Sequence, residues 1–159
     1  MREILFRGKS NWDDGKVKKG DWLYSMTISR HCYNDEEITS YYIGSGNKTI
    51  DGKTLGQYTG LTDKNGKKIF EGDIIRYTRT DMYAPSCSFH KQNLVSIHLV
   101  LWDSSVSAFV QQHYSLNEKR IVGKGSAVLY DDRAKENIVE VIGNIHDNPE
   151  LLKSEVDAI

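Results

Sequence analysis

Apolar and polar residues alternate along several stretches of this chain with a period of two, which is the pattern of a half-buried β-strand. From Asp21 to Ser29 the pattern predicts one strand with one face on a core. One face of it holds Trp22, Tyr24, Met26 and Ile28, and the other holds Leu23, Ser25, Thr27 and Ser29. From Leu94 to Trp102 the alternation is equally regular, with Val95, Ile97, Leu99 and Leu101 on one face.

Shorter stretches rich in β-branched and aromatic residues predict further strands. They are Glu3 to Arg7, Thr39 to Ile43, Val106 to Val110, Ala127 to Tyr130 and Ile138 to Ile142. We expect Val106 to Val110 to return antiparallel to the preceding strand. Near the end of the chain, Asn148-Pro149-Glu150 predicts a short helix with Asn148 as its N-cap.

The segment from Tyr58 to Tyr77 predicts a hairpin followed by a third strand. Strands at Tyr58 to Thr62 and Lys67 to Phe70 flank Asp63-Lys64-Asn65-Gly66. Asn-Gly tolerates positive φ at both central positions, so we expect a type I′ turn there. Glu71-Gly72-Asp73 then reverses the chain into a strand from Ile74 to Thr78. The Asp73 carboxylate is placed to accept backbone N–H groups in that reversal.

These elements predict a mainly β protein in two parts. Residues 1–50 form a small antiparallel subdomain, and a Gly-rich stretch around residues 44–52 marks the boundary. Residues 51–159 form a bent-sheet or SH3-like barrel subdomain closed by the short C-terminal helix. Because edge strands of so small a sheet need covering, we expect a homo-oligomer.

The charge and cysteine content narrow the function classes. The 159 residues carry a formal net charge of −1, so the whole molecule presents no strong field to nucleic acid or to a membrane. The hairpin region is mildly basic, and the C-terminal end is acidic. Two cysteines make no disulfide framework, and neither a signal peptide nor a 20-residue apolar run is present. We therefore expect the bacterial cytoplasm and no membrane partner.

The strongest candidate for a binding surface is the hairpin region, where cations lie close in sequence to aromatic rings. Small β-barrels bind single-stranded nucleic acid with such combinations. The candidate residues are Tyr58, Lys64, Lys67, Lys68, Arg76 and Arg79. The alternative is that Phe70 and Tyr77 belong to the core and that the lysines only keep the hairpin tip in water. We favour the alternative, because a net charge of −1 argues against strong, salt-sensitive binding.

Candidate chemistry is sparse. Cys87-x-x-His90 and the adjacent His31 and Cys32 fall short of the two ligand pairs that a structural zinc site uses. A dyad of Cys87 with His113 or His146 is no more than the composition allows. His146-Asp147 is better interpreted as a turn, and residues 123–126 as a β-turn rather than a phosphate loop. We expect no catalytic residue, no metal and no cofactor.

Three segments of the chain resemble one protein family. They are REILFRGK at Arg2 to Lys9, GQYTGLTDKNGKKIFEGDIIRY at Gly56 to Tyr77, and VIGNIHDNPELL at Val141 to Leu152. Their content and order are similar to the YopX family of phage and prophage proteins. The resemblance implies a β-rich, phage-encoded protein of uncharacterised function, and it supplies no functional residue.

Together these features predict a non-enzymatic binding or assembly module that acts on a host or phage protein. A nucleic-acid-binding small β-barrel is the alternative, and an enzyme comes third.

Overall fold

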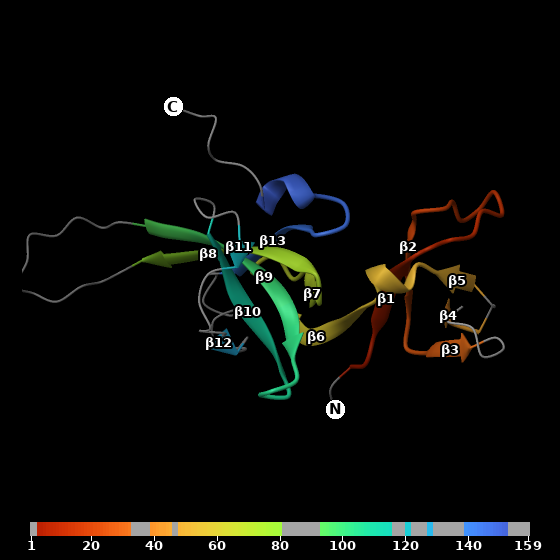
Figure 1. Cartoon of the computed structure of the whole chain (residues 1–159). Coiled ribbons are helices and arrows are strands. Elements are labelled where there is room, and N and C mark those ends of the chain that lie inside the picture. The colour runs from red at the N-terminus through yellow and green to blue at the C-terminus, as the bar shows by residue number, and fades with distance from the viewer. Residues whose placement is uncertain are drawn as a thin grey trace, which may run out of the picture. The chain divides into compact units, whose positions relative to one another are not determined.

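A computed structural model of the chain describes residues 3–32, 39–45, 48–80, 93–115, 120–121, 127–128 and 139–152. These residues form strands and two short 3-10 turns, so the expectation of a mainly β protein is confirmed (Figure 1). In the described part of the chain, no helix is long and apolar enough to cross a membrane. The chain divides into two compact units, Met1–Gly60 and Leu61–Ile159. The division falls inside a strand, ten residues beyond the expected boundary.

Unit 1 contains two antiparallel sheets. In the first, β1 (Phe6–Lys9) lies between β2 (Trp22–Ser25) and the start of β6 (Gly56–Thr62). The second has the order β3-β4-β5. Its strands are β3 (Ile28–Cys32), β4 (Thr39–Ile43) and β5 (Lys48–Ile50), and the 3-10 turn η1 (Gly52–Thr54) then leads into β6. Ile43 and Ile50 are buried and form the core of this unit.

The prediction of a single strand from Asp21 to Ser29 is wrong, because β2 ends at Ser25 and β3 begins at Ile28. The Ser25 hydroxyl accepts the Thr27 N–H at 3.1 Å, which favours a turn over continued pairing. Tyr24 and Met26 are 55% and 72% exposed, so their face is open rather than covered by a core. The other face is the packed one, because Leu23 lies opposite Gly8, where a Cβ would overlap the Ile50 side chain.

Unit 2 is organised around a larger antiparallel sheet with the order β11-β10-β9-β8-β13, to which β12 adds beside β10. Figure 1 shows the long strands β8, β9 and β10 side by side. The bounds are β7 (Lys68–Phe70), β8 (Asp73–Thr80), β9 (Asn93–Asp103), β10 (Ala108–Ser115), β11 (Arg120–Ile121), β12 (Ala127–Val128) and β13 (Val139–Asn144). The antiparallel return after Asp103 is confirmed.

Both faces of this sheet carry buried residues. Alternation predicted the face of β9 that holds Leu99, and Leu99 is 7% exposed, while its cross-strand neighbour Ile74 is fully buried beside it. The opposite face, which alternation did not single out, carries the core cluster of Ile69, Ile75, Val100, Val139 and Val141. Val95, at the start of β9, is 58% exposed, so the predicted face is buried over only part of its length.

The described strands of unit 2 form open sheets, and no closed barrel occurs among them. An SH3-like barrel is therefore not confirmed. The expected C-terminal helix is also not confirmed, since Pro149–Leu152 forms one 3-10 turn, η2. Asn148 donates through Nδ2 to Glu150 Oε1 at 3.4 Å. Asn144 organises the turn that precedes η2, where its Oδ1 accepts the N–H groups of His146 and Asp147, each at 2.9 Å.

Candidate functional site

The hairpin turn at Asp63 to Gly66 is built around one buried carboxylate. Asp63 Oδ1 accepts the N–H groups of Asn65 at 2.8 Å and Lys67 at 2.9 Å. Asp63 Oδ2 accepts the Val141 N–H at 3.0 Å, across 78 residues of sequence. Burial raises the pKa of Asp63, but the three backbone N–H donors outweigh it and bring the pKa below its usual value. The carboxylate therefore joins the hairpin to β13.

The turn type expected from Asn-Gly is wrong. Gly66 has φ +78°, but Asn65 has negative φ. The Gly66 N–H donates to the Asp63 carbonyl at 2.9 Å, and the Asp63 N–H donates to the Lys67 carbonyl at 2.8 Å. This is a type I turn followed by a glycine bulge, the usual three-residue hairpin connection. The Asp63 side chain stabilises it by accepting N–H groups that a type I′ turn would direct elsewhere.

The reversal at Gly72 and Asp73 is also structural. Gly72 has φ +81°, and its N–H donates to the Val100 carbonyl at 2.9 Å. A Cβ at this position would meet no clash, since its nearest neighbour would be 3.6 Å away, so the positive φ is the reason for glycine. Asp73 is buried and its Oδ2 accepts the Phe70 N–H at 2.8 Å, which confirms the expected acceptor role.

The edge strand β13 is covered by the same turn. The Lys64 N–H donates to the Val139 carbonyl at 3.0 Å, two residues from the Val141 N–H that Asp63 accepts. Backbone groups that an edge strand would otherwise present to another chain are thus used internally. The polar and glycine residues of this segment, which carries the strongest family resemblance, therefore act in folding. We expect a functional site outside them.

The predicted binding surface is not assembled as a set. Lys64 Nζ lies 2.8 Å from Glu140 Oε2, and Arg76 Nη1 lies 3.6 Å from the same atom. The Lys64 hydrogen bond is the main reason that the pKa of Glu140 is lowered; burial opposes it, and the Arg76 charge adds to it. Lys67 is exposed and Lys68 is half-buried. Two cations of this surface therefore share one carboxylate, which offsets one of their two positive charges.

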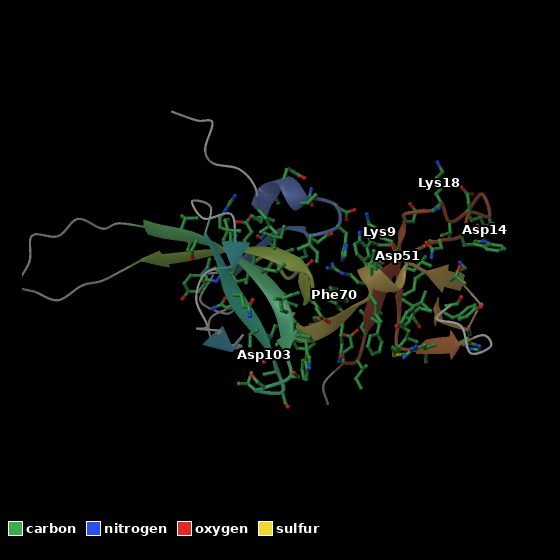
Figure 2. All side chains as sticks on the ribbon, in the orientation of Figure 1. Lys9, Asp14, Lys18, Asp51, Phe70 and Asp103 are labelled. Carbon is green, nitrogen blue, oxygen red and sulfur yellow. The ribbon has the colours of Figure 1, made fainter. Side chains whose placement is uncertain are left out.

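The aromatic rings expected beside those cations are not offered to a ligand. Tyr58 is only 5% exposed and lies in unit 1, and Phe70 is buried in β7 (Figure 2). Tyr77 is half-buried against the core of unit 2. Arg79 lies in β8, but its side chain is outside the described part of the structure. The interpretation of Phe70 and Tyr77 as core residues agrees with this placement.

Cations and aromatic rings do meet on the first sheet of unit 1. The register pairs Arg7 with Tyr24 and Lys9 with Trp22, so the four side chains share one face of β1 and β2. The Arg7 Cζ is 4.6 Å from the centre of the Trp22 ring, and the Lys9 Nζ is 5.6 Å from it. Lys9 is labelled in Figure 2. We call Arg7, Lys9, Trp22 and Tyr24 the aromatic face.

Sequence reasoning missed the aromatic face, although a signal was available. Arg7 and Lys9 are two residues apart, as are Trp22 and Tyr24, and period two puts each pair on one side of its strand. What the sequence did not show is that these two strands pair with each other and that Tyr24, on the shared side, is exposed. Arg7 is 6% exposed, so its guanidinium supports the Trp22 ring rather than facing the solvent.

A serine–histidine pair lies in unit 2, on the face of β9 that carries Val100. Ser96 Oγ and His98 Nε2 are 2.7 Å apart, and the Tyr77 ring meets the imidazole edge-on at 5.8 Å. Gln111, on the same face of β10, is 4% exposed, and its Oε1 has no hydrogen-bond partner among the described residues. A serine–histidine pair is one part of a nucleophilic site, but by itself it specifies no reaction.

The other chemical candidates find little support. Within the described ranges, no three His, Cys, Asp or Glu side chains gather closely enough to hold a metal ion. Cys87, His90 and residues 123–126 lie outside those ranges, and so do the side chains of Cys32 and His113. His146 lies in the turn that Asn144 organises, as expected of a turn residue.

Comparisons with known proteins place the chain in a family. No curated protein matches it. The crystal structure of protein EF1440 from Enterococcus faecalis shares 21% sequence identity, with 94% of this chain and 98% of that chain covered. Its TM-score of 0.44 is too low to support an argument about function. The family model described as YopX protein matches residues 4–153, which confirms the resemblance seen in the sequence. The chain belongs to the YopX family.

Proposed function

We propose that this chain is a non-enzymatic binding or assembly module, encoded by a phage or prophage and acting in the bacterial cytoplasm. The phage origin and the location are drawn from the family resemblance. The observation that supports a binding role is the aromatic face, on which Tyr24 is 55% exposed and Trp22 lies beside two cations.

The composition of this face is typical of a binding surface. Tyrosine and tryptophan combine a large apolar area with a polar tip, and they are enriched among the residues that dominate binding energy. The stacked Arg7 guanidinium holds the Trp22 ring in one orientation, which lowers the entropy lost on binding. By contrast, Asp63, Gly72 and Asp73 of the hairpin segment are occupied in folding.

The experiment is affinity capture from a bacterial lysate with the full chain and with Tyr24→Ser. Both the captured protein and the captured nucleic acid are quantified. We expect Tyr24→Ser to lose most of what the wild type retains, while the folded structure is kept, because Tyr24 is exposed.

The matched control is Val95→Ser, which removes an exposed apolar side chain of β9 in unit 2. It is expected to capture the same material as the wild type. Light scattering of the same proteins tests assembly, because a homo-oligomer joined through the aromatic face would lose mass in Tyr24→Ser only. Equal capture and equal mass for wild type and Tyr24→Ser would refute the proposed role of this face.

A further inference from the structure

The aromatic face has the chemistry of a surface that stacks bases and contacts a phosphate. Its four side chains are two rings and two cations. Residues two apart on a strand are separated by about 6.6–6.8 Å, so Trp22 and Tyr24 form two neighbouring platforms along β2. Sheets that carry aromatic side chains at such positions stack successive bases of a single strand.

Each of the four residues has a separate role in this arrangement. Tyr24, the most exposed of the four, offers its ring to one base. Trp22 is held from one side by the Arg7 guanidinium at 4.6 Å and offers a positioned ring to the next. Lys9, half-buried with its Nζ 5.6 Å from the Trp22 centre, lies within reach of a phosphate linking the two bases. Arg7 is a positioning residue because it is buried.

We propose that the aromatic face binds single-stranded nucleic acid by stacking on Tyr24 and Trp22 and by an ion pair from Lys9. The inference rests on the proposed binding function and names its ligand. A protein partner would use the two rings but not Lys9, because the cores of protein interfaces are depleted in lysine. The hairpin cations are less suited to this role, since Lys64 and Arg76 share the Glu140 carboxylate.

The test is a fluorescence anisotropy titration of labelled 12-residue oligo-dT and oligo-U with the full chain at 50 and 200 mM salt. We expect binding of both strands, with quenching of tryptophan emission, and no competition from duplex DNA, whose bases are already stacked. Tyr24→Ser is expected to weaken binding by about 5- to 150-fold, because it removes the ring that stacks on one base. Tyr24→Phe, which keeps the ring, should bind like the wild type.

Lysine variants separate the phosphate contact from general charge. Lys9→Gln should weaken binding and reduce the slope of log affinity against log salt by about 0.7, the contribution of one phosphate on a single strand. Lys64→Gln removes the same charge from the hairpin and should leave affinity and slope within twofold of the wild type.

Several outcomes would overturn the inference. They are no oligonucleotide binding at 50 mM salt, equal binding by Tyr24→Ser and the wild type, or a larger loss in Lys64→Gln than in Lys9→Gln. Competition by inorganic polyphosphate that is as strong as competition by oligo-dT would show a charge effect without stacking. If the lysate capture depends on Tyr24 but no oligonucleotide binds, only the ligand is wrong. If both fail, the proposed function fails too.

Discussion

Removing the Asp63 carboxylate tests whether the hairpin signature acts in folding. In Asp63→Ala three backbone donors lose their acceptor, and the Val141 N–H is buried. A buried donor left unsatisfied costs about 1–3 kcal/mol, and each of the two partly buried turn donors loses about 0.5–1.5 kcal/mol. The expected loss in the free energy of unfolding of unit 2 is therefore about 2–6 kcal/mol.

Asp63→Asn is the easier variant to measure. The loss expected for Asp63→Ala can approach the whole stability of a domain, which is about 5–15 kcal/mol. The amide keeps one acceptor oxygen where the carboxylate used both, so either the turn or the Val141 bond loses its acceptor. We expect about half the loss of the alanine variant, or about 1–3 kcal/mol.

Urea unfolding at pH 7 measures these losses. Trp12 and Trp22 lie in unit 1, so replacing both with Phe leaves Trp102, which packs edge-on against Phe109 at 5.0 Å, as the reporter of unit 2. Hydrogen exchange at the Val141 amide adds a local measurement. A loss below about 1 kcal/mol in Asp63→Ala, with unchanged protection of that amide, would refute the role given to Asp63.

The dependence on pH follows from the lowered pKa of Asp63. Because the carboxylate is favoured in the folded state, its contribution is complete above the ordinary value of 3.8. It is lost as the pH falls through the lower pKa of the folded state. The difference in stability between wild type and Asp63→Asn should therefore be largest near neutral pH and shrink as the pH falls below 3.8. A difference that stays constant down to pH 2 would mean that the charge does not contribute.

Three further substitutions test single backbone features by thermal unfolding. Gly66→Val should cost about 1 kcal/mol or more, because a β-branched residue resists φ +78°, while Gly66→Asn should cost less; equal melting temperatures would contradict the glycine bulge. Asn144→Ala should lose about 1–2 kcal/mol and Asn148→Ala less than half of that, because Asn144 accepts two N–H groups of the turn that precedes η2, whereas the Asn148 side chain donates to Glu150 at 3.4 Å; the reverse order would restore Asn148 as the cap. Gly143→Ala should cost about 1–3 kcal/mol, since its Cβ would lie 2.7 Å from both Asn148 Oδ1 and Leu151 Cδ1; an unchanged stability would show that the last turn adjusts freely.

The local sequence predicted which segments form strands better than it predicted how they turn. The hairpin after Tyr58 and the antiparallel pair on either side of Asp103 follow from alternation and turn residues. The turn type did not follow, because Asn-Gly allows two geometries. The choice between them was made by the Asp63 side chain, which accepts N–H groups inside the turn and from a strand 78 residues away.

Which side of a strand is buried could not be derived from alternation alone. Trp22 and Tyr24 look like a core face, yet Leu23 lies on the packed side opposite Gly8, where only a glycine allows Ile50 to approach. On β9 both faces carry core residues, because Val100 lies on the side of Ser96 and His98 and Leu99 lies on the other. A strand has two faces of equal backbone geometry, so the choice depends on what packs against each.

The sequence by itself determined the strand-rich class of this protein, its family, and the glycine and aspartate positions that its turns require. These properties depend on period, turn chemistry and short-range hydrogen bonds, all of which are local. The pairing of β1 with β2 and the sharing of Glu140 by Lys64 and Arg76 were decided only by the tertiary structure. Segments far apart in the chain meet there. The candidate surface moved from the hairpin to the aromatic face because a binding surface depends on which side chains end up adjacent and uncovered.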